Sequence, residues 1–386
     1  MILFRLRRPF GFPYLDYVNG HMVTRYCACY TPLTADYLAA NSYTLSDTVT
    51  GGWFVVSADV TATQRIVCSG DVHLILCDGK TLNAEAGGIS VNDPSSLTVY
   101  AQTSYENDPT GATMGALTAR PSDNNSAAIG SDEVQVAGSI TINGGKVSAI
   151  NSSTNWNITA AGIGSGRCRS SPPPEHITSI VINDGIVTAQ GGQNSAGIGS
   201  GSSFDYSRGG VIEINGGHVT AHGRSYGAGI GSSSSAYIET IKITGGVVTA
   251  DSNYGCGIGP GGSGAGAYIA GNVSISGGTV TASSTNGMGI GGRTITITGG
   301  AVTATSTNGA GIGEGTTASG TLTLGWQDND ASSGLPRITA SSYQVNTINY
   351  STAAHTFAAA TAPTTALTTE EIKTLTGATI IPTEVT

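Results

Sequence analysis

The chain has 386 residues, of which only 11% are charged and 6% aromatic, and it contains 57 glycines. Globular domains of this size usually have more charged and aromatic residues, and the glycines follow no collagen period. The net charge of −9 comes without a basic stripe, which argues against a nucleic acid as partner. No apolar run is long enough to span a membrane.

Residues 1–50 precede any repeating pattern. The start, MILFRLRRPFGFPYLDYVNG, has arginines but no apolar run followed by a small-residue cleavage site, so it does not read as a signal peptide. Either the protein is cytoplasmic or the chain begins inside a longer gene product; we favour the second and expect this segment to be a junction or cap. Cys27 and Cys29 are too close for a usual pair of structural zinc ligands, and a disulfide stays open for Cys27, Cys29 or Cys168.

Short apolar-alternating runs separated by glycine begin near Trp53. They continue through GGWFVVSADVTATQRIVCSGDVHLILCDGKTLNAEAGGISV, which is typical of strands and turns. A degenerate copy of the repeat follows, in the three segments SSLTVYAQ, GALTAR and NNSAAIGS. Strands are therefore expected before the clear repeats start, with Cys77 buried as a free thiol.

Six copies of one phrase follow, and the last is TITITGGAVTATSTNGAGIG at residues 294–313. Each copy closes on Gly-Ile-Gly, with the isoleucines at Ile163, Ile198, Ile230, Ile258, Ile290 and Ile312. The steps between them are 35, 32, 28, 32 and 22 residues, which is the range of solenoid repeats. The shortest step indicates a minimal unit of about 22 residues, with insertions in the longer copies.

The last copy shows how one unit is built. Ile295 and Ile297 point one way while the flanking threonines point the other, and Val302 and Ala304 continue the inward face after a double glycine. A period of two is that of half-buried strands. Three strands and three turns in so few residues predict one coil of a single-stranded parallel β-helix, stacked at about 4.8 Å per coil. We expect this all-β solenoid over residues 51–345.

Equivalent positions of the copies should form vertical files. The inward file before each closing isoleucine is Ala161, Ala196, Ala228, Cys256, Met288 and Ala310. The file that opens the double-glycine turn is Asn143, Asn183, Asn215, Thr244, Ser276 and Thr298, and its asparagines can hydrogen-bond as a ladder. Glu213 and Lys242 share an outward file in adjacent coils, where a surface ion pair is expected.

The end of the chain, residues 346–386, is expected to cap the solenoid. TTEEIKTLTG at residues 368–377 places a threonine and then glutamates before apolar residues, which is the signature of a short capped helix. Such a cap would cover the open edge that a solenoid otherwise exposes.

GWFVVSADVTATQRIVCSGDVHLILCDGKTL, followed by SLTVYAQ and the repeated ITINGGxVTA…GAGIGSG, resembles repeat regions of large secreted surface proteins of Gram-positive anaerobes. These are similar to the pectate-lyase-like right-handed β-helix superfamily, one branch of which contains carbohydrate-binding modules. The resemblance covers roughly residues 50–345. It implies a right-handed coil, an extracellular or cell-surface location, and attachment through neighbouring modules.

No catalytic or metal site is predicted. A glycosidase needs paired carboxylates, whereas the outward positions carry mostly threonine, serine or single charges. His218 and His222 are four residues apart in a strand-and-turn region, which does not make a metal site. No cofactor is predicted; such a fold is compatible with calcium, but no calcium motif is present.

Aromatic side chains in the repeats mark the candidate binding surface. Tyr226 and Tyr254 fall at the same turn position of adjacent coils and should stack. The insertions add Trp156, Phe204, Tyr206, Arg208, Tyr237 and Tyr268. Flat rings beside polar groups suit a sugar, so a polysaccharide or a host or matrix glycan is the expected partner. The alternative is that the rings cover insertion loops and glycine-rich backbone.

Three functions stay open from the sequence. The favoured one is a non-enzymatic extracellular module, adhesin-like or carbohydrate-binding. The second is a polysaccharide lyase or glycoside hydrolase on the same fold, and the third is a purely structural stalk. Exposed aromatics without a carboxylate cluster would favour the first.

Overall fold

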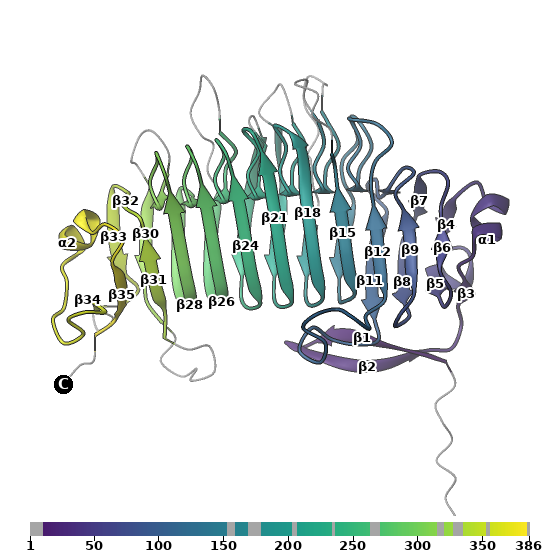
Figure 1. The fold of residues 1–386 in the computed structure, drawn as a ribbon, viewed down its shortest axis with the longest axis horizontal. Helices are drawn as coiled ribbons and strands as arrows, with labels where there is room; N and C mark the ends of the chain where they lie inside the picture. Colours follow the sequence, from purple (N-terminus) through teal and green to yellow (C-terminus); the bar gives the residue numbers. More distant parts are fainter. Residues whose placement is uncertain are drawn as a thin grey trace, which may run out of the picture.

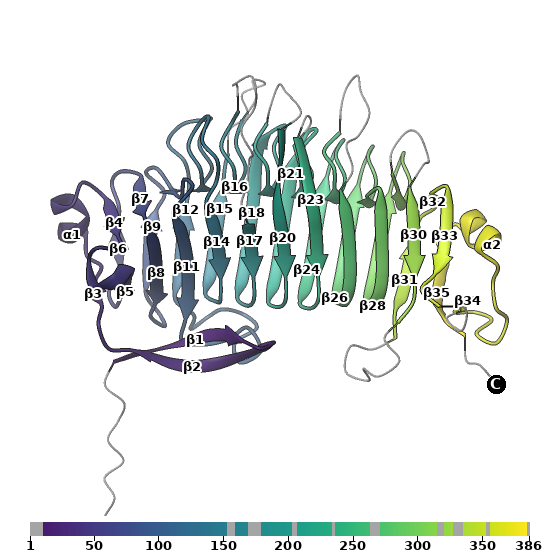
Figure 2. The same cartoon turned by 180° about the vertical axis from the view of Figure 1, so that it is seen from behind.

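The computed structural model describes residues 11–152, 159–168, 179–202, 207–233, 236–262, 271–314, 320–326, 335–352 and 356–383. These residues form a row of stacked coils whose long axis is horizontal in Figure 1, and Figure 2 shows the same row from behind. Each repeat contributes strands to three parallel faces. The predicted parallel β-helix is therefore confirmed.

The first face, prominent in Figure 2, contains the opening strand of each coil. Its strands are β3 (Thr31–Pro32), β5 (Trp53–Val56), β8 (Asp71–Leu76), β11 (Ser96–Ala101), β14 (Ser139–Ile142), β17 (Ser179–Ile182), β20 (Ser207–Ile214), β23 (Ala236–Ile243), the first halves of β26 (Asn272–Ser284) and β28 (Thr294–Ser306), β30 (Thr321–Leu324) and β33 (Thr347–Tyr350). Because β26 and β28 run on into the second face, the two faces form one continuous sheet.

The second face, at the front of Figure 1, follows the double-glycine turn. Its strands are β6 (Val60–Thr61), β9 (Thr81–Ala84), β12 (Ala116–Ala119), β15 (Lys146–Ile150), β18 (Ile186–Gln193), β21 (His218–Arg224), β24 (Val247–Ser252), the second halves of β26 and β28, and β31 (Arg337–Ala340).

The third face is a narrow sheet made mainly of the closing Gly-Ile-Gly segments. Its strands are β4 (Thr44–Ser46), β7 (Ile66–Ser69), β10 (Ile89–Ser90), β13 (Ile129–Gly130), β16 (Ile163–Gly164), β19 (Ile198–Gly199), β22 (Ile230–Gly231), β25 (Ile258–Gly259), β27 (Ile290–Gly291), β29 (Ile312–Gly313) and β32 (Tyr343–Gln344). Its register is direct, since Ile163 pairs with Ile198 and Ile198 with Ile230.

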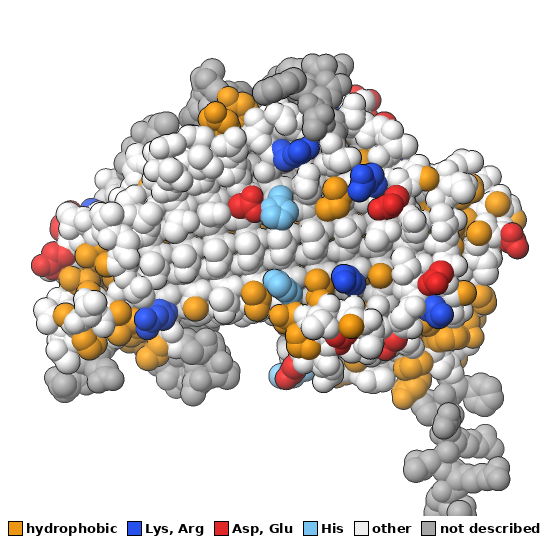
Figure 3. Space-filling model, viewed as in Figure 1, with side chains coloured by type: hydrophobic (Ala, Val, Ile, Leu, Met, Phe, Trp, Pro, Cys, Tyr) orange, Lys and Arg blue, Asp and Glu red, His pale blue; other side chains and the backbone are white. Residues whose placement is uncertain are grey.

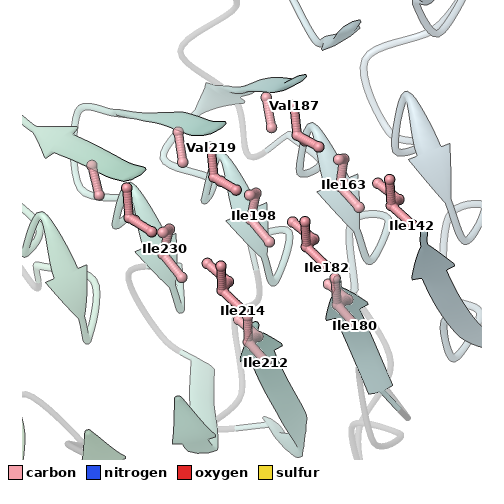
Figure 4. Packing of buried hydrophobic residues seen from close by; sticks show 14 of the residues in the cluster. Ile142, Ile163, Ile180, Ile182, Val187, Ile198, Ile212, Ile214, Val219 and Ile230 are labelled. Atoms are coloured by element: carbon pink, nitrogen blue, oxygen red, sulfur yellow. The ribbon is translucent and has the colours of Figure 1, made fainter. Parts of the chain in front are cut away.

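The core lies between the three faces and is built of repeated aliphatic files. Ile163, Ile198 and Ile230 are fully buried, as the repeat alignment required. Figure 4 shows these isoleucines as one row, with parallel rows from the other two faces beside it; Ile182 and Ile214 belong to the row from the first face. Burying one such side chain contributes about 1.5–3 kcal/mol, so the same contribution recurs coil after coil.

Polar files confirm the predicted ladder and ion pair. Asn183 Nδ2 donates to Asn143 Oδ1 at 2.7 Å, and Asn215 Nδ2 donates to Asn183 Oδ1 at 2.8 Å. Lys242 Nζ lies 2.9 Å from Glu213 Oε1 on the first face. Stacked coils therefore satisfy polar side chains along the axis as well as backbone groups.

The N-terminal end of the solenoid begins before residue 50, the boundary expected from the sequence. β3 pairs in parallel with β5, and β4 pairs with β7. Between them, helix α1 (Ala35–Ala40) lies at the end of the row in Figure 1. Thr34 caps it by accepting a hydrogen bond from the backbone N–H of Tyr37, and Leu38 is fully buried in the core. The 3₁₀ turn η1 (Thr50–Gly52) leads into β5.

An antiparallel hairpin of β1 (Phe12–Val18) and β2 (His21–Cys27) lies outside the coils. It crosses the ends of several first-face strands in both views (Figures 1 and 2). Tyr14 packs against Trp53 and Tyr100, with ring centroids 5.1 and 4.8 Å apart. Val55 and Ile75, whose strand neighbours face the core, are buried in this outer cluster instead.

The C-terminal end carries helix α2 (Thr369–Thr374) and the strands β34 (Phe357–Ala359) and β35 (Thr379–Pro382). The capping box expected from the sequence is present: the Thr368 side chain accepts from the backbone N–H of Glu371, whose carboxylate accepts from that of Thr368. Ile372 is buried in the core, and β35 pairs antiparallel with β31. These elements therefore cover part of the last coil.

Candidate functional site

The candidate site is a shallow groove where β21 and β24 leave the second face. It has a volume of about 570 Å³, and we call it the tyrosine groove. Its walls include Arg224, Tyr226, Asp251, Asn253, Tyr254 and Thr285. Figure 3 shows the second face, on which a broad band of side chains is neither charged nor hydrophobic. The groove's charged and aromatic residues thus lie beside a mostly neutral polar surface.

Tyr226 and Tyr254 contact each other as predicted. Their ring centroids are 4.9 Å apart and their planes meet at 30°, because equivalent turn positions of adjacent coils lie one strand spacing apart. The Tyr226 ring is half-buried, and a Cβ at Gly262 would lie 3.2 Å from its Cδ1. Tyr254 is 41% exposed. Of the two rings, Tyr254 is therefore the more accessible to a ligand in solution, while Tyr226 also packs on glycine backbone.

Hydrogen-bonding side chains of both kinds line the groove. Arg224 is the last residue of β21, and its Nη1 lies 3.5 Å from the carbonyl oxygen of Ser152. Asn253 and Thr285 are exposed. A guanidinium only donates, whereas an amide and a hydroxyl can donate and accept. The groove can therefore bond ligand hydroxyls in either sense.

His222 and Asp251 form a charged pair at the edge of the groove. They are in register on β21 and β24, and Nδ1 of His222 lies 2.5 Å from Oδ1 of Asp251. This hydrogen bond, assisted by the carboxylate's charge, raises the pKa of His222 above 6.5, while burial opposes the shift. Both side chains are about two-fifths exposed, at 41% and 42%. The pair therefore fixes Asp251 without removing it from solvent.

Of the other predicted binding residues, only Tyr237 has a described side chain. It is half-buried on β23 and does not line the groove, and the backbone of Arg208 on β20 pairs with it in register. Trp156, Phe204, Tyr206 and Tyr268 lie outside the described residues. Of the candidates whose side chains are described, only Tyr226 and Tyr254 come together, and a role in binding stays a prediction for all of them.

Sequence reasoning did not select Arg224, Asp251 or Asn253. A signal was present for Asp251, which occupies the same outward file as Gln190, His222 and Ser283. An acid and a histidine in adjacent coils of one file predict a contact. Arg224 ends β21 next to a register shift and Asn253 lies in a turn, and at such positions the alignment of repeats alone does not fix the direction of a side chain.

Within the described ranges, no three His, Cys, Asp or Glu side chains gather as a metal site would require. Among the described groove-lining residues, Asp251 is the one carboxylate. None of the described helices has the length and apolar character needed to cross a membrane. The groove's described lining therefore offers aromatic rings, hydroxyls, amides, the Arg224 guanidinium and the Asp251 carboxylate.

Comparison with known families identifies the repeats. A family model described as Beta helix repeat matches residues 140–167, 180–202, 212–234, 241–262, 273–292 and 295–313. No match was found among curated proteins or solved structures. The matched stretches begin on first-face strands and include the closing Gly-Ile-Gly segments. The stacked parallel faces and these six repeats show that the chain has the fold of a right-handed parallel β-helix, with the matched repeats lying between residues 140 and 313.

Proposed function

We propose that the chain is a carbohydrate-binding module of an extracellular surface protein, adhesin-like, and that the tyrosine groove is its binding site. The observation that carries the proposal is the stacked pair Tyr226 and Tyr254 beside side chains that donate and accept hydrogen bonds. The apolar face of a pyranose packs on an aromatic ring while its hydroxyls bond polar groups. Tyr254 offers such an exposed ring.

The number of carboxyl groups in the described lining of the groove favours binding over hydrolysis. Two carboxyl groups are needed for the usual glycosidase mechanism, at separations of about 5–10 Å. The described lining contributes Asp251 alone, and its Oδ1 is bonded to His222. A binding site has no such requirement and needs only complementary rings and hydrogen-bonding groups.

The surface location is supported by the resemblance of the repeats to secreted surface proteins. Attachment would then come from neighbouring modules, with the solenoid presenting the groove. A long rigid rod suits this role, because its stacked coils hold the groove at a fixed position relative to both ends. The glycan partner would be a cell-wall, matrix or host polysaccharide.

A glycan array tests the proposal with three proteins: wild type, a Tyr226→Ala/Tyr254→Ala double variant, and Tyr26→Ala. Tyr26 is a matched control, since it is 47% exposed on the hairpin, away from the groove. We expect wild type and Tyr26→Ala to bind the same glycans. The double variant should bind them with an affinity at least about tenfold lower. Equal binding by all three, or no binding by wild type, would contradict the proposal and favour a structural stalk.

A further inference from the structure

The tyrosine groove does not end at Tyr254. A second depression of about 490 Å³ shares Asp251, Ser252 and Thr285 with it. This depression, which we call the threonine extension, continues along Ser283, Thr305 and Thr307 on β26, β28 and the turn that follows. Together the two depressions run along the solenoid axis across the coils of β21, β24, β26 and β28, with Gln193 of the preceding strand β18 at one end.

The floor of this combined groove is the same in successive coils. Ser252, Ser284 and Ser306 each donate from Oγ to a glycine carbonyl of the preceding coil, at 2.6, 2.7 and 2.6 Å. The same Oγ atoms accept from the backbone N–H three residues later, at 3.0, 2.8 and 2.9 Å. The repeated bonds hold three equivalent turns at one spacing, so the groove is a series of like subsites.

An exposed amide file runs beside the groove, and of its members only Asn253 belongs to the lining. Asn286 Nδ2 donates to Asn253 Oδ1 at 3.1 Å, and Asn308 Nδ2 donates to Asn286 Oδ1 at 2.8 Å. A primary amide has two N–H groups and a carbonyl with two lone pairs, so each keeps bonding capacity beyond the ladder. One wall of the groove is the outward file Asp251, Ser283 and Thr305, which is in direct register. Each coil therefore repeats an oxygen in the groove and an exposed amide next to it.

We propose that the combined groove binds a linear, unbranched, neutral polysaccharide that lies along the solenoid axis; this inference rests on the proposed carbohydrate binding. One sugar unit would lie on each coil, with the tyrosine pair toward one end. Coils stacked at about 4.8 Å match the length of one pyranose unit in an extended chain. Beyond Asp251, the described lining of the threonine extension is all serine and threonine. Hydroxyls can bond neutral sugars but cannot balance a chain of carboxylates, which Asp251 would also repel.

Titration calorimetry of wild type with neutral β-1,4-linked probes tests chain length. Cello- and xylo-oligosaccharides of two, four and six units are compared with hexagalacturonate. We expect affinity to rise about tenfold or more from the dimer to the hexamer of the better series, since each added unit engages another subsite. We expect hexagalacturonate to bind at least tenfold more weakly than that neutral hexamer.

A distal variant tests the position of the chain. Thr305→Ala/Thr307→Ala removes two hydroxyls that line the far end of the groove, and Thr279→Ala is the control, an exposed threonine of β26 outside both depressions. The double variant should lower hexamer affinity about fivefold or more and leave dimer affinity unchanged; the control should change neither. Circular dichroism checks that both fold.

The outcomes separate this inference from the function on which it rests. If the dimer binds as tightly as the hexamer, if hexagalacturonate binds better, or if the distal variant behaves like Thr279→Ala, the axial neutral chain is wrong. The tyrosine-dependent binding of the array would still stand. If no oligosaccharide binds and the array gives no tyrosine-dependent signal, both are overturned.

Discussion

Asn183 and Asn143, one coil apart, are joined by a side-chain hydrogen bond of 2.7 Å, which is one of a series of such bonds along the solenoid axis. Thr244 Oγ1 donates to Asn215 Oδ1 at 2.6 Å, Asn215 donates to Asn183, and Asn143 Nδ2 donates to Asp16 Oδ1 at 3.2 Å. In every bond the donor is the residue later in the sequence, so each bond polarises the next. The series ends on the Asp16 carboxylate, which also binds Arg25 at 2.8 Å. The ladder thus joins the coils to the N-terminal hairpin.

Replacing Asn183 by alanine should destabilise the protein by about 1–3 kcal/mol, because buried Asn143 loses its donor and Asn215 loses its acceptor. Asn183 is only 8% exposed. Asn286→Ala, in the exposed ladder, is the matched control and should cost less than about 1 kcal/mol. Urea unfolding followed by circular dichroism gives both values. Equal effects would show that burial of the ladder is unimportant.

The repeats made most of the solenoid predictable, for a physical reason. Stacked coils place equivalent positions next to each other, so aligning copies also gives contacts: Ile198 on Ile230, Asn215 on Asn183, and Lys242 beside Glu213. The stacking of Tyr226 on Tyr254 followed in the same way. In such a fold, a sequence alignment is already a partial contact map.

The hairpin and the groove's full composition could not be predicted in this way. The hairpin occurs once, so no file fixes its register, and the outward apolar residues Val55 and Ile75 gave no sign of what covers them. Their neighbours Phe54 and Leu74 fill the core as alternation requires. At Arg224, which ends β21, and at Asn253, which lies in a turn, local backbone geometry orients the side chain, and a period of two does not describe that geometry.

Gly231→Ala should be severely destabilising, by roughly 2–5 kcal/mol. Gly231 has φ +138°, and an added Cβ would lie 1.9 Å from the carbonyl oxygen of Gly259 in the next coil. Gly79→Ala is the control: its φ is +68°, but nothing lies within 4 Å of the added atom. That change should cost only about 1–2 kcal/mol of backbone strain. Comparable losses in denaturant unfolding would mean that the close approach of coils is not the cause.

The His222–Asp251 pair should make stability depend on pH. The bond to Asp251 raises the pKa of His222 above its ordinary value of 6.5. The folded state therefore binds the proton more tightly, and the stabilisation is fully present below pH 6.5 and lost as pH rises through the folded pKa. Because solvent reaches about two-fifths of each side chain and screens the pair, its contribution to stability should be about 0.2–1 kcal/mol.

The measurement compares unfolding free energies of wild type and His222→Gln between pH 5 and 9. Wild type should be more stable at pH 5, and the difference should shrink toward pH 9. His21→Gln, on the hairpin, is the control for the general effect of losing a histidine. A difference that stays constant or grows with pH would contradict the assigned pair.

Thiol reactivity should separate Cys29 from the other cysteines in the native protein. Cys29 is exposed, whereas Cys27, Cys68, Cys77 and Cys256 are buried. Burial raises the pKa of Cys256 to about 12, so almost none of it is thiolate at pH 8, and thiolate is the reactive form. We expect DTNB to modify one thiol quickly and the rest only in urea. The fast phase should disappear in Cys29→Ser and persist in Cys256→Ser; a fast phase that survives the first change would show that a coil opens readily around a buried thiol.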